Sequence, residues 1–233
     1  MSLLASYRAS SGDNTAVAVR SFSDGDDTND EFRLIKWHFL ARAASGEVTG
    51  RNPRVLLVTS AARGEGKSYV AHHLAANFAL DPHIQLTLID ANFDNPALGS
   101  SSWLGGSSGG PGLLDYLEDQ SMDQSRIVKS TGLGNVHAIL SGSGRSNAPE
   151  LLSDTRLDHL MASLTASSNS FVIVDAGPIL SSSGAAVLAR VAGHIAFVVA
   201  SNRTSRNQIN KALGTLDRIA GPIDEKSLGL IFN

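Results

Sequence analysis

The chain has 233 residues, of which 42% are hydrophobic and 18% are charged, and its 19 basic and 22 acidic residues give a net charge of −3. This length fits one domain, and the hydrophobic fraction excludes a globally disordered chain. The slightly acidic balance argues against a protein that coats nucleic acid, so we expect no nucleic-acid partner. Because the chain has no cysteine, disulfides and thiolate metal sites are excluded.

The sequence carries no sign of export or of membrane insertion. No apolar run approaches the roughly 20 residues that a membrane-spanning helix needs, and residues 1–10 lack the apolar stretch of a signal peptide. We therefore expect a cytoplasmic protein that reaches a membrane only through a partner. Residues 1–29 are rich in Ser, Asp, Gly and Asn and are predicted to form a flexible tail, so the folded domain is predicted to span residues 30–233.

Strands and helices are predicted to alternate along this domain. A first helix is predicted from about Asp30 to about Ala44, with Thr28, Asn29 or Asp30 as its cap. Residues 99–110 are mostly Gly and Ser and are predicted to form a mobile loop. The predicted strands are 55–58, 86–90, 136–140, 171–175, 195–200 and 228–232, and the predicted further helices are 67–80, 113–118, 149–164, 184–191 and 206–219. Apolar strands that alternate with helices predict an α/β fold with a mostly parallel sheet and helices on both faces.

Residues 59–68, Thr-Ser-Ala-Ala-Arg-Gly-Glu-Gly-Lys-Ser, follow a predicted strand and open a predicted helix, which is the context of a phosphate-binding loop. Gly64 and Gly66 let the backbone N–H groups approach phosphate oxygens closely. Lys67 is predicted to reach the β- and γ-phosphates of ATP, and the Ser68 hydroxyl to bind Mg²⁺. The alternative is a Gly-rich turn with a solvated lysine. This loop predicts a P-loop NTPase fold in which the nucleotide contacts are Arg63, Gly64, Glu65, Gly66, Lys67, Ser68 and Tyr69.

Two further predicted strands end in aspartate. Asp175 closes the apolar run 171–174, and a carboxylate in that position beside a phosphate loop is typical of a group that holds Mg²⁺, directly or through water. Asp90 closes the other strand, and in an extended chain Asn92 and Asp94 lie on the same face as Asp90 and face the γ-phosphate. The alternatives are a helix cap for Asp175 and ordinary turn chemistry for the others. The predicted catalytic residues are Lys67, Asp90, Asn92 and Asp175, and the predicted metal ligands are Ser68, Asp90 and Asp175.

From about residue 30 onward, these motifs resemble those of the bacterial tyrosine kinases (BY-kinases) of exopolysaccharide and capsule co-polymerase systems. The phosphate loop is similar to the family's first motif, except that Arg63 replaces a proline. Residues 146–152 are similar to the family's Pro-Asn-Pro-x-Glu-Leu-Leu, and Asp175-Ala-Gly-Pro178 matches its Asp-x-x-Pro. Ala62 occupies the position where partitioning and division-site ATPases carry a signature lysine, which argues against their mechanism.

The resemblance implies a MgATP-dependent tyrosine autokinase that regulates polysaccharide chain assembly and export. It implies a Wzz-like co-polymerase in the inner membrane as the partner, with the kinase on the cytoplasmic side. It also implies that Asn233, at the end of the last predicted strand, meets the adenine. Asp30, Arg33 and Lys36 are similar to the family's Glu-x-x-Arg-x-x-Arg helix, which implies self-association into rings.

Two features depart from the family pattern. Its Asp-x-Asp-x-Arg motif is here Asp90-Ala-Asn92-Phe-Asp94, so one carboxylate becomes an amide that cannot take a proton and one cation becomes an anion. The given sequence does not contain the family's terminal tyrosine cluster, so either the sequence is truncated or the protein does not autophosphorylate in the usual way. Its only tyrosines are Tyr7, Tyr69 and Tyr116. Of these, Tyr7 in the predicted tail is the candidate acceptor. The alternatives to an active kinase are therefore a nucleotide-gated regulator with little catalysis (a pseudokinase) and an assembly subunit that binds no nucleotide.

Overall fold

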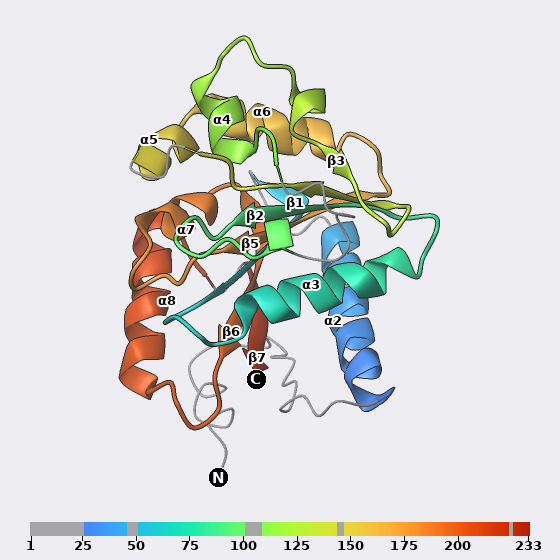
Figure 1. Ribbon diagram of the computed structural model, residues 1–233. Helices are drawn as coiled ribbons and strands as arrows, with labels where there is room; N and C mark the ends of the chain where they lie inside the picture. Colours follow the sequence, from blue (N-terminus) through green and yellow to red (C-terminus); the bar gives the residue numbers. More distant parts are fainter. Residues whose placement is uncertain (1–25, 46–50, 101–108, 144–146, 224–225) are drawn as a thin grey trace.

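The computed structural model describes residues 26–45, 51–100, 109–143, 147–223 and 226–233 (Figure 1). Their central feature is a seven-stranded sheet of order β3-β4-β2-β5-β1-β6-β7, in which every neighbouring pair is parallel except β3 and β4. The predicted α/β fold with a mostly parallel sheet is confirmed. Residues 1–25, which include Tyr7, and residues 101–108 of the predicted loop lie outside the described residues.

The elements follow the predicted alternation, with small shifts of their ends. The strands are β1 (Asn52–Ser60), β2 (Gln85–Ala91), β3 (Lys129–Ser130), β4 (Val136–Ile139), β5 (Ser170–Ala176), β6 (Ala192–Val199) and β7 (Ser227–Phe232). The helices are α2 (Asp26–Ser45), α3 (Lys67–Ala79), α4 (Leu113–Glu118), α5 (Ala148–Leu152), α6 (Thr155–Leu164), α7 (Ser183–Leu188) and α8 (Arg206–Ala220). Short 3₁₀ turns lie at Leu98–Ser100 and Gln124–Arg126.

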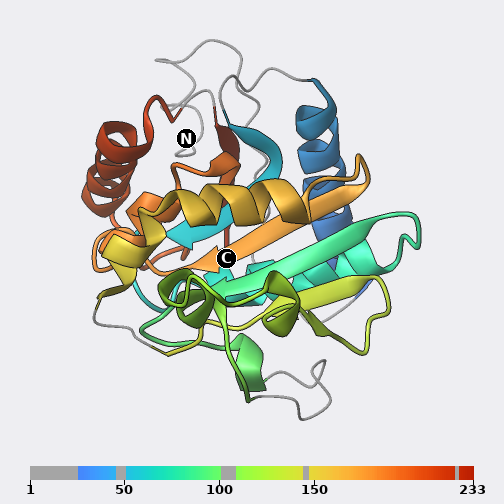
Figure 2. The same ribbon diagram turned by 90° about the horizontal axis from the view of Figure 1, so that it is seen from above.

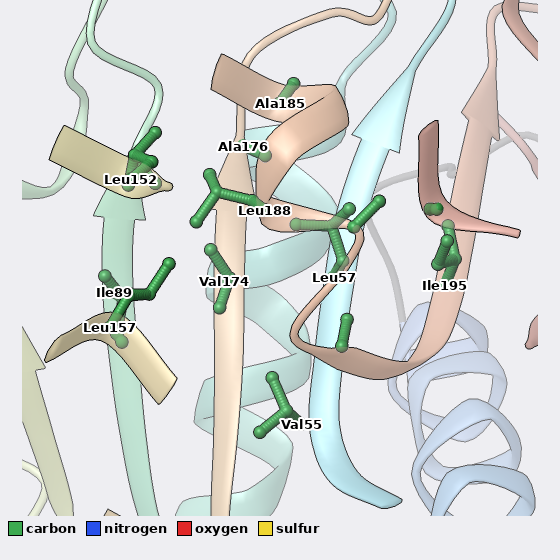
Figure 3. Close-up of a cluster of buried hydrophobic side chains, with 14 of the residues drawn as sticks. Val55, Leu57, Ile89, Leu152, Leu157, Val174, Ala176, Ala185, Leu188 and Ile195 are labelled. Carbon is green, nitrogen blue, oxygen red and sulfur yellow. The ribbon is translucent and has the colours of Figure 1, made fainter. Parts of the chain in front are cut away.

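Helices cover both faces of the sheet because the central strands are apolar on both faces. On one face, Leu56 of β1 and Ile173 of β5 pack with α2 and α3. On the other face, Leu57 of β1 and Val174 of β5 pack with α4 to α8. Figure 1 shows α2 beside α3 below the sheet, and Figure 2 shows α6 lying across β1 and β5. In Figure 3, side chains of α5, α6 and α7 meet those of β1, β2 and β5, with Leu188 among them. Burial of successive residues on opposite faces explains the apolar runs 55–58 and 171–174.

Besides these small shifts, three features differ from the prediction. The predicted helix 149–164 is two helices, because Asp154 leaves the helical path and its side chain accepts from the N–H of Arg156 to cap α6. Helix α2 begins at Asp26, so the predicted caps at 28–30 lie inside the helix. The two-residue strand β3 was not predicted, since so short a segment has no readable periodicity.

The topology brings the predicted site segments to one edge of the sheet. Strand β5 lies between β1 and β2, so the loop after β1 and the aspartates at the ends of β2 and β5 are neighbours. Asp90 and Asp175 are register partners, which places their backbones about 5 Å apart. None of the helices in the described ranges is long and apolar enough to cross a membrane.

Candidate active site

The phosphate loop runs from the end of β1 to the start of α3, and it depends on two glycines with positive φ. Gly64 has φ of 77° and Gly66 has φ of 90°, and Gly66 caps the N-terminus of α3. These values lie in the left-handed region that glycine adopts without strain. The loop therefore wraps over the positive end of α3, where its N–H groups form an anion-binding concavity.

A buried glutamate holds this loop in shape. The Glu65 side chain is 2% exposed, and its carboxylate accepts from the Ala62 N–H and from the Thr204 hydroxyl. Asn233 donates from Nδ2 to the Glu65 carbonyl at 3.2 Å. A Cβ atom on Gly66 would lie 2.0 Å from that same Nδ2. Asn233, predicted to meet the adenine, is thus placed against the phosphate loop itself.

Sequence reasoning missed two residues that follow β6. Thr204 supports Glu65, and Arg203 donates from Nη1 to the Gly64 carbonyl at 3.4 Å. Both come from the carboxyl end of a parallel strand next to β1, which is where residues of a nucleotide site gather. No sequence pattern indicated them. The contacts follow from the burial of Glu65, whose carboxylate needs donors from elsewhere in the chain.

Lys67, Ser68 and Asp175 lie together beneath the loop. Lys67 is 7% exposed, and burial lowers the pKa of its ammonium group, an effect that the negative charges of Asp175 and Glu65 oppose. Burial raises the pKa of Asp175 to about 7, with a further increase from Asp90, while Ser68 and Lys67 act in the opposite direction. The first residues of α3 and the end of β5 therefore form one electrostatic unit.

The Asp175 carboxylate is suited to a cation. It is 1% exposed, and neither oxygen has a hydrogen-bond partner of good geometry among the described residues, although the Ser68 hydroxyl lies near enough to affect its pKa. A buried carboxylate without partners is costly unless a positive ion or a proton compensates it. Hard oxygen donors from a hydroxyl and a carboxylate fit Mg²⁺, which takes its remaining ligands from phosphates and water.

Asp90 has a structural task in addition to its predicted one. Its Oδ1 accepts from the N–H of Asn92 at 3.2 Å, and its Oδ2 accepts from the N–H groups of Ala97 and Leu98 at 2.9 Å each. The carboxylate thus ties down both ends of the turn that follows β2. The catalytic and metal-binding roles of Asp90 remain predictions.

A shared face for Asp90, Asn92 and Asp94 requires the strand to continue to Asp94. The chain instead turns after β2. The N–H of Asn95 donates to the Asn92 carbonyl at 3.0 Å, which turns the chain back at Phe93 and Asp94. Asn92 is 3% exposed, whereas Asp94 lies at the surface and pairs with Arg63 at 2.8 Å. The expectation of one shared face was wrong, because the strand ends at Ala91.

The two described tyrosines are both engaged in packing. Tyr69 is 38% exposed and its ring lies 4.0 Å from the ring of His73, between α3 and Phe32 of α2. Tyr116 is 8% exposed, with the guanidinium of Arg156 4.0 Å above its ring. Tyr69 therefore links the first turn of α3 to α2, and its predicted nucleotide contact remains a prediction.

Helix α2 presents apolar side chains to solvent. Leu34 and Trp37 are 64% and 56% exposed. Of the three residues that resemble the family's ring motif, Asp30 and Arg33 pair at 2.7 Å on the surface. Lys36 turns inward, is 5% exposed and donates to the Asn77 carbonyl at 3.2 Å. The outer face of α2 therefore includes an ion pair and two large apolar side chains.

An open cavity adjoins the acidic end of the site. It has a volume of about 660 Å³ and includes Asp90, Pro96, Pro111, Leu140 and Ser143 in its lining. Its walls come from the carboxyl ends of β2 and β4 and from the segment before α4. The cavity meets Asp90 on the β4 side of the site. The residues that contact the phosphate loop, Thr204 and Asn233, lie on the opposite side, by β6 and β7.

Comparisons with known proteins agree with this fold. No family model matches the chain. The chain is 32% identical over 183 residues to the tyrosine-protein kinase YwqD of Bacillus subtilis, an alignment that covers 78% of this chain and 73% of YwqD. It is similar to the BceF tyrosine kinase domain, with 26% identity, a TM-score of 0.69 and coverage of 88% and 75%. The kinase domain of the Escherichia coli tyrosine kinase ETK has the same fold, with 22% identity, a TM-score of 0.71 and coverage of 100% and 87%.

Proposed function

Because this chain belongs to the family of bacterial tyrosine kinases, we propose that it binds MgATP and transfers the γ-phosphoryl group to a tyrosine hydroxyl. The observation that carries this proposal is the buried Asp175 carboxylate, which lacks partners of good geometry among the described residues and faces Lys67 and Ser68. A buried carboxylate without a well-formed hydrogen bond leaves its negative charge for a bound cation to compensate.

Each residue of the site has a defined part in phosphoryl transfer. The loop N–H groups and Lys67 bind the phosphate oxygens, and Ser68 and Asp175 hold Mg²⁺. When bound, Mg²⁺ neutralises the charge that develops on the β- and γ-phosphates. Thr204 and Asn233 keep the loop closed around Glu65. Such positioning and charge stabilisation supply most of the catalysis in this class of reaction.

The transfer itself forms one bond and breaks one. The tyrosine oxygen bonds to the γ-phosphorus while the bond from that phosphorus to the β–γ bridging oxygen breaks, and ADP leaves with the electron pair. The hydroxyl proton passes to a carboxylate, and we assign this role to Asp90, which borders the cavity of about 660 Å³. Asn92 cannot accept the proton, because an amide nitrogen carries no available lone pair. We infer that the acceptor tyrosine enters through that cavity.

The test is incubation of the full chain with γ-labelled ATP, Mg²⁺ and a tyrosine-containing acidic copolymer, followed by mapping of the label. Label on tyrosine that disappears in Lys67→Met supports the kinase. ADP formation is measured in parallel, since hydrolysis without label on tyrosine identifies an ATPase. Absence of any nucleotide binding, measured by calorimetry with MgADP, rules out the proposal.

A second function, a nucleotide-gated regulator with little catalysis, is favoured by one specific observation. Asn92 is buried, and its Oδ1 would lie 3.7 Å from a Cβ atom on Gly177, so the amide sits beside the end of β5, where the family has a carboxylate. In this case the chain binds MgATP but labels neither itself nor the copolymer. Asn92→Asp then raises the rate of labelling, whereas it has little effect in an active kinase that relies on Asp90.

We further propose that the protein self-associates through α2 and works with a membrane co-polymerase in polysaccharide export. Exposed Leu34 and Trp37 support the first part, because two large apolar side chains on one helix favour contact with a partner. Light scattering with MgADP tests it: Trp37→Glu lowers the mass of the assembly, while Leu80→Glu, at an equally exposed position after α3, does not. A monomer at high protein concentration contradicts it. Cell fractionation with and without the co-expressed co-polymerase tests the second part.

A further inference from the structure

One ion pair joins the phosphate loop to the turn after β2. Arg63 donates from Nη2 to Oδ2 of Asp94 at 2.8 Å, and the two side chains are 68% and 46% exposed. These are also two positions at which the sequence departs from the kinase motifs, one by gaining a cation and the other by gaining an anion. The pair therefore sets one positive and one negative charge at the solvent edge of the phosphate cradle.

The order of the strands indicates which part of a nucleotide meets this pair. Thr204 and Asn233 contact the loop from the side of β6 and β7, whereas Asp175 and Asp90 lie on the other side of β1, at the ends of β5 and β2. Mg²⁺ held by Ser68 and Asp175 would supply the positive charge that the terminal phosphates require. The terminal phosphate therefore lies toward β5 and β2, and this is the side from which Asp94 reaches Arg63.

The exchange of partners at Arg63 is favourable for simple reasons. An exposed ion pair contributes little to stability, since water and salt screen both charges. A guanidinium bound to phosphate makes charge-assisted hydrogen bonds, often two in parallel, and the phosphate carries more charge than a carboxylate. Arg63 has five N–H donors, of which the bond to Asp94 uses one.

We propose that Arg63 binds the terminal phosphate of a nucleoside triphosphate, which displaces Asp94 from the guanidinium. The inference rests on the proposed function, because it requires a nucleotide in the phosphate loop. Arg63 then distinguishes a triphosphate from a diphosphate. Asp94 competes with the terminal phosphate for the guanidinium and so determines how large the difference in affinity is.

The test compares binding of MgADP and of the magnesium complex of a non-hydrolysable ATP analogue to the full chain by calorimetry. Arg63→Ala is expected to weaken binding of the analogue about tenfold, the equivalent of one charge-assisted hydrogen bond, and binding of ADP less than about twofold. Asp94→Ala is expected to strengthen binding of the analogue, because it removes both a competitor and a like charge. Arg218→Ala, an exposed arginine on α8 whose side chain contacts Thr215 of the same helix, is the matched control.

The double variant Arg63→Ala/Asp94→Ala separates the proposal from its simplest rival. If Arg63 serves only to neutralise Asp94, the double variant binds the analogue as tightly as the wild type. If Arg63 contacts the phosphate, the double variant remains weaker than the wild type for the analogue and unchanged for ADP. Restoration of wild-type affinity therefore overturns the proposal.

The two levels of inference fail in different ways. If the wild type binds neither nucleotide, both the proposed function and the role of Arg63 are wrong. If the wild type binds both and Arg63→Ala changes the two affinities equally or leaves both unchanged, the assignment of Arg63 is wrong while the proposed function stands.

Discussion

Replacement of Asp175 by asparagine is expected to stabilise the nucleotide-free protein above neutral pH and to weaken its Mg²⁺-dependent binding of nucleotide. The Asp175 side chain is 1% exposed, and burial raises its pKa to about 7. Its ionisation in the folded protein is therefore costly, and the cost is the consequence of holding a carboxylate ready for a cation. Asparagine keeps the shape of the side chain and removes the charge.

The sign and size of the effect follow from the pKa difference. A carboxyl group whose pKa is raised on folding binds more protons in the folded state, so its favourable contribution at low pH is lost as pH rises from about 4 to about 7. The difference between 3.8 and about 7 for Asp175 corresponds to about 4 kcal/mol above pH 7, and roughly 2 kcal/mol of that penalty is already present at pH 5. The advantage of Asp175→Asn over the wild type should therefore grow by about 2–3 kcal/mol between pH 5 and pH 8.

The assay is urea unfolding of the wild type and Asp175→Asn at pH 5 and pH 8, without nucleotide or Mg²⁺. The comparison of two pH values removes any pH-independent effect of the new amide on packing. Asp158→Asn, at an exposed position on α6, is the control, and its stability should stay within about 0.5 kcal/mol of the wild type at both pH values. A stability difference between Asp175→Asn and the wild type that does not depend on pH, or that shrinks toward pH 8, refutes the reasoning.

Four other substitutions test further features of the structure. Gly66→Ala should lower the melting temperature and the nucleotide affinity, because its Cβ would lie 2.0 Å from Asn233 at a φ of 90°. Gly214→Ala in α8, where a Cβ would have no atom within 4 Å, should instead stabilise the protein by about 0.5–1 kcal/mol. Equal melting temperatures of the two variants would contradict this prediction. Thr204→Val leaves the buried glutamate of the loop short of one donor and should cost about 1–3 kcal/mol in urea unfolding, and an unchanged midpoint would show that water replaces the hydroxyl. Burial lowers the pKa of His194 to about 4, so the wild type loses stability as pH falls from about 6.5 to about 4, and His194→Leu should remove this loss in thermal unfolding measured across that range.

The fold was predictable where the sequence is locally consistent. The run 171–174 before Asp175 is apolar at every position, and the run 86–89 before Asp90 is apolar except for Thr87, because both faces of those strands are covered. No helix with a polar face has that pattern. The phosphate loop was predictable for a related reason, since Gly64 and Gly66 are needed for positive φ at two fixed places. Such features depend on near neighbours in the chain.

Features that depend on distant partners were not predictable. The contact of Thr204 with Glu65 joins residues 139 positions apart, and no sequence pattern near either residue indicates it. Lys36 reads as a surface residue of an exposed helix, yet its stem is buried and its ammonium group donates to a carbonyl of α3. Tertiary structure also changed the meaning of Asp90, which binds the N–H groups of a turn that the extended prediction did not contain.

Arg63 and Asp94 both depart from the kinase motifs, and they have to be assessed together because they form an ion pair. Taken alone, Asp94 in place of the family's arginine changes the charge beside the polyphosphate by two units. Because Arg63 stands 2.8 Å away where the family has an uncharged residue, the difference across the two positions is one charge. That charge lies at the exposed apex of a turn whose base Asp90 fixes through Ala97 and Leu98. The guanidinium is free to follow a phosphate, while the carboxylate can retreat only as far as that turn permits. Tolerance of the altered motif therefore depends on the stiffness of the turn. A turn loosened at Ala97 and Leu98 should bind the triphosphate more tightly, because Asp94 can then move further from the phosphate.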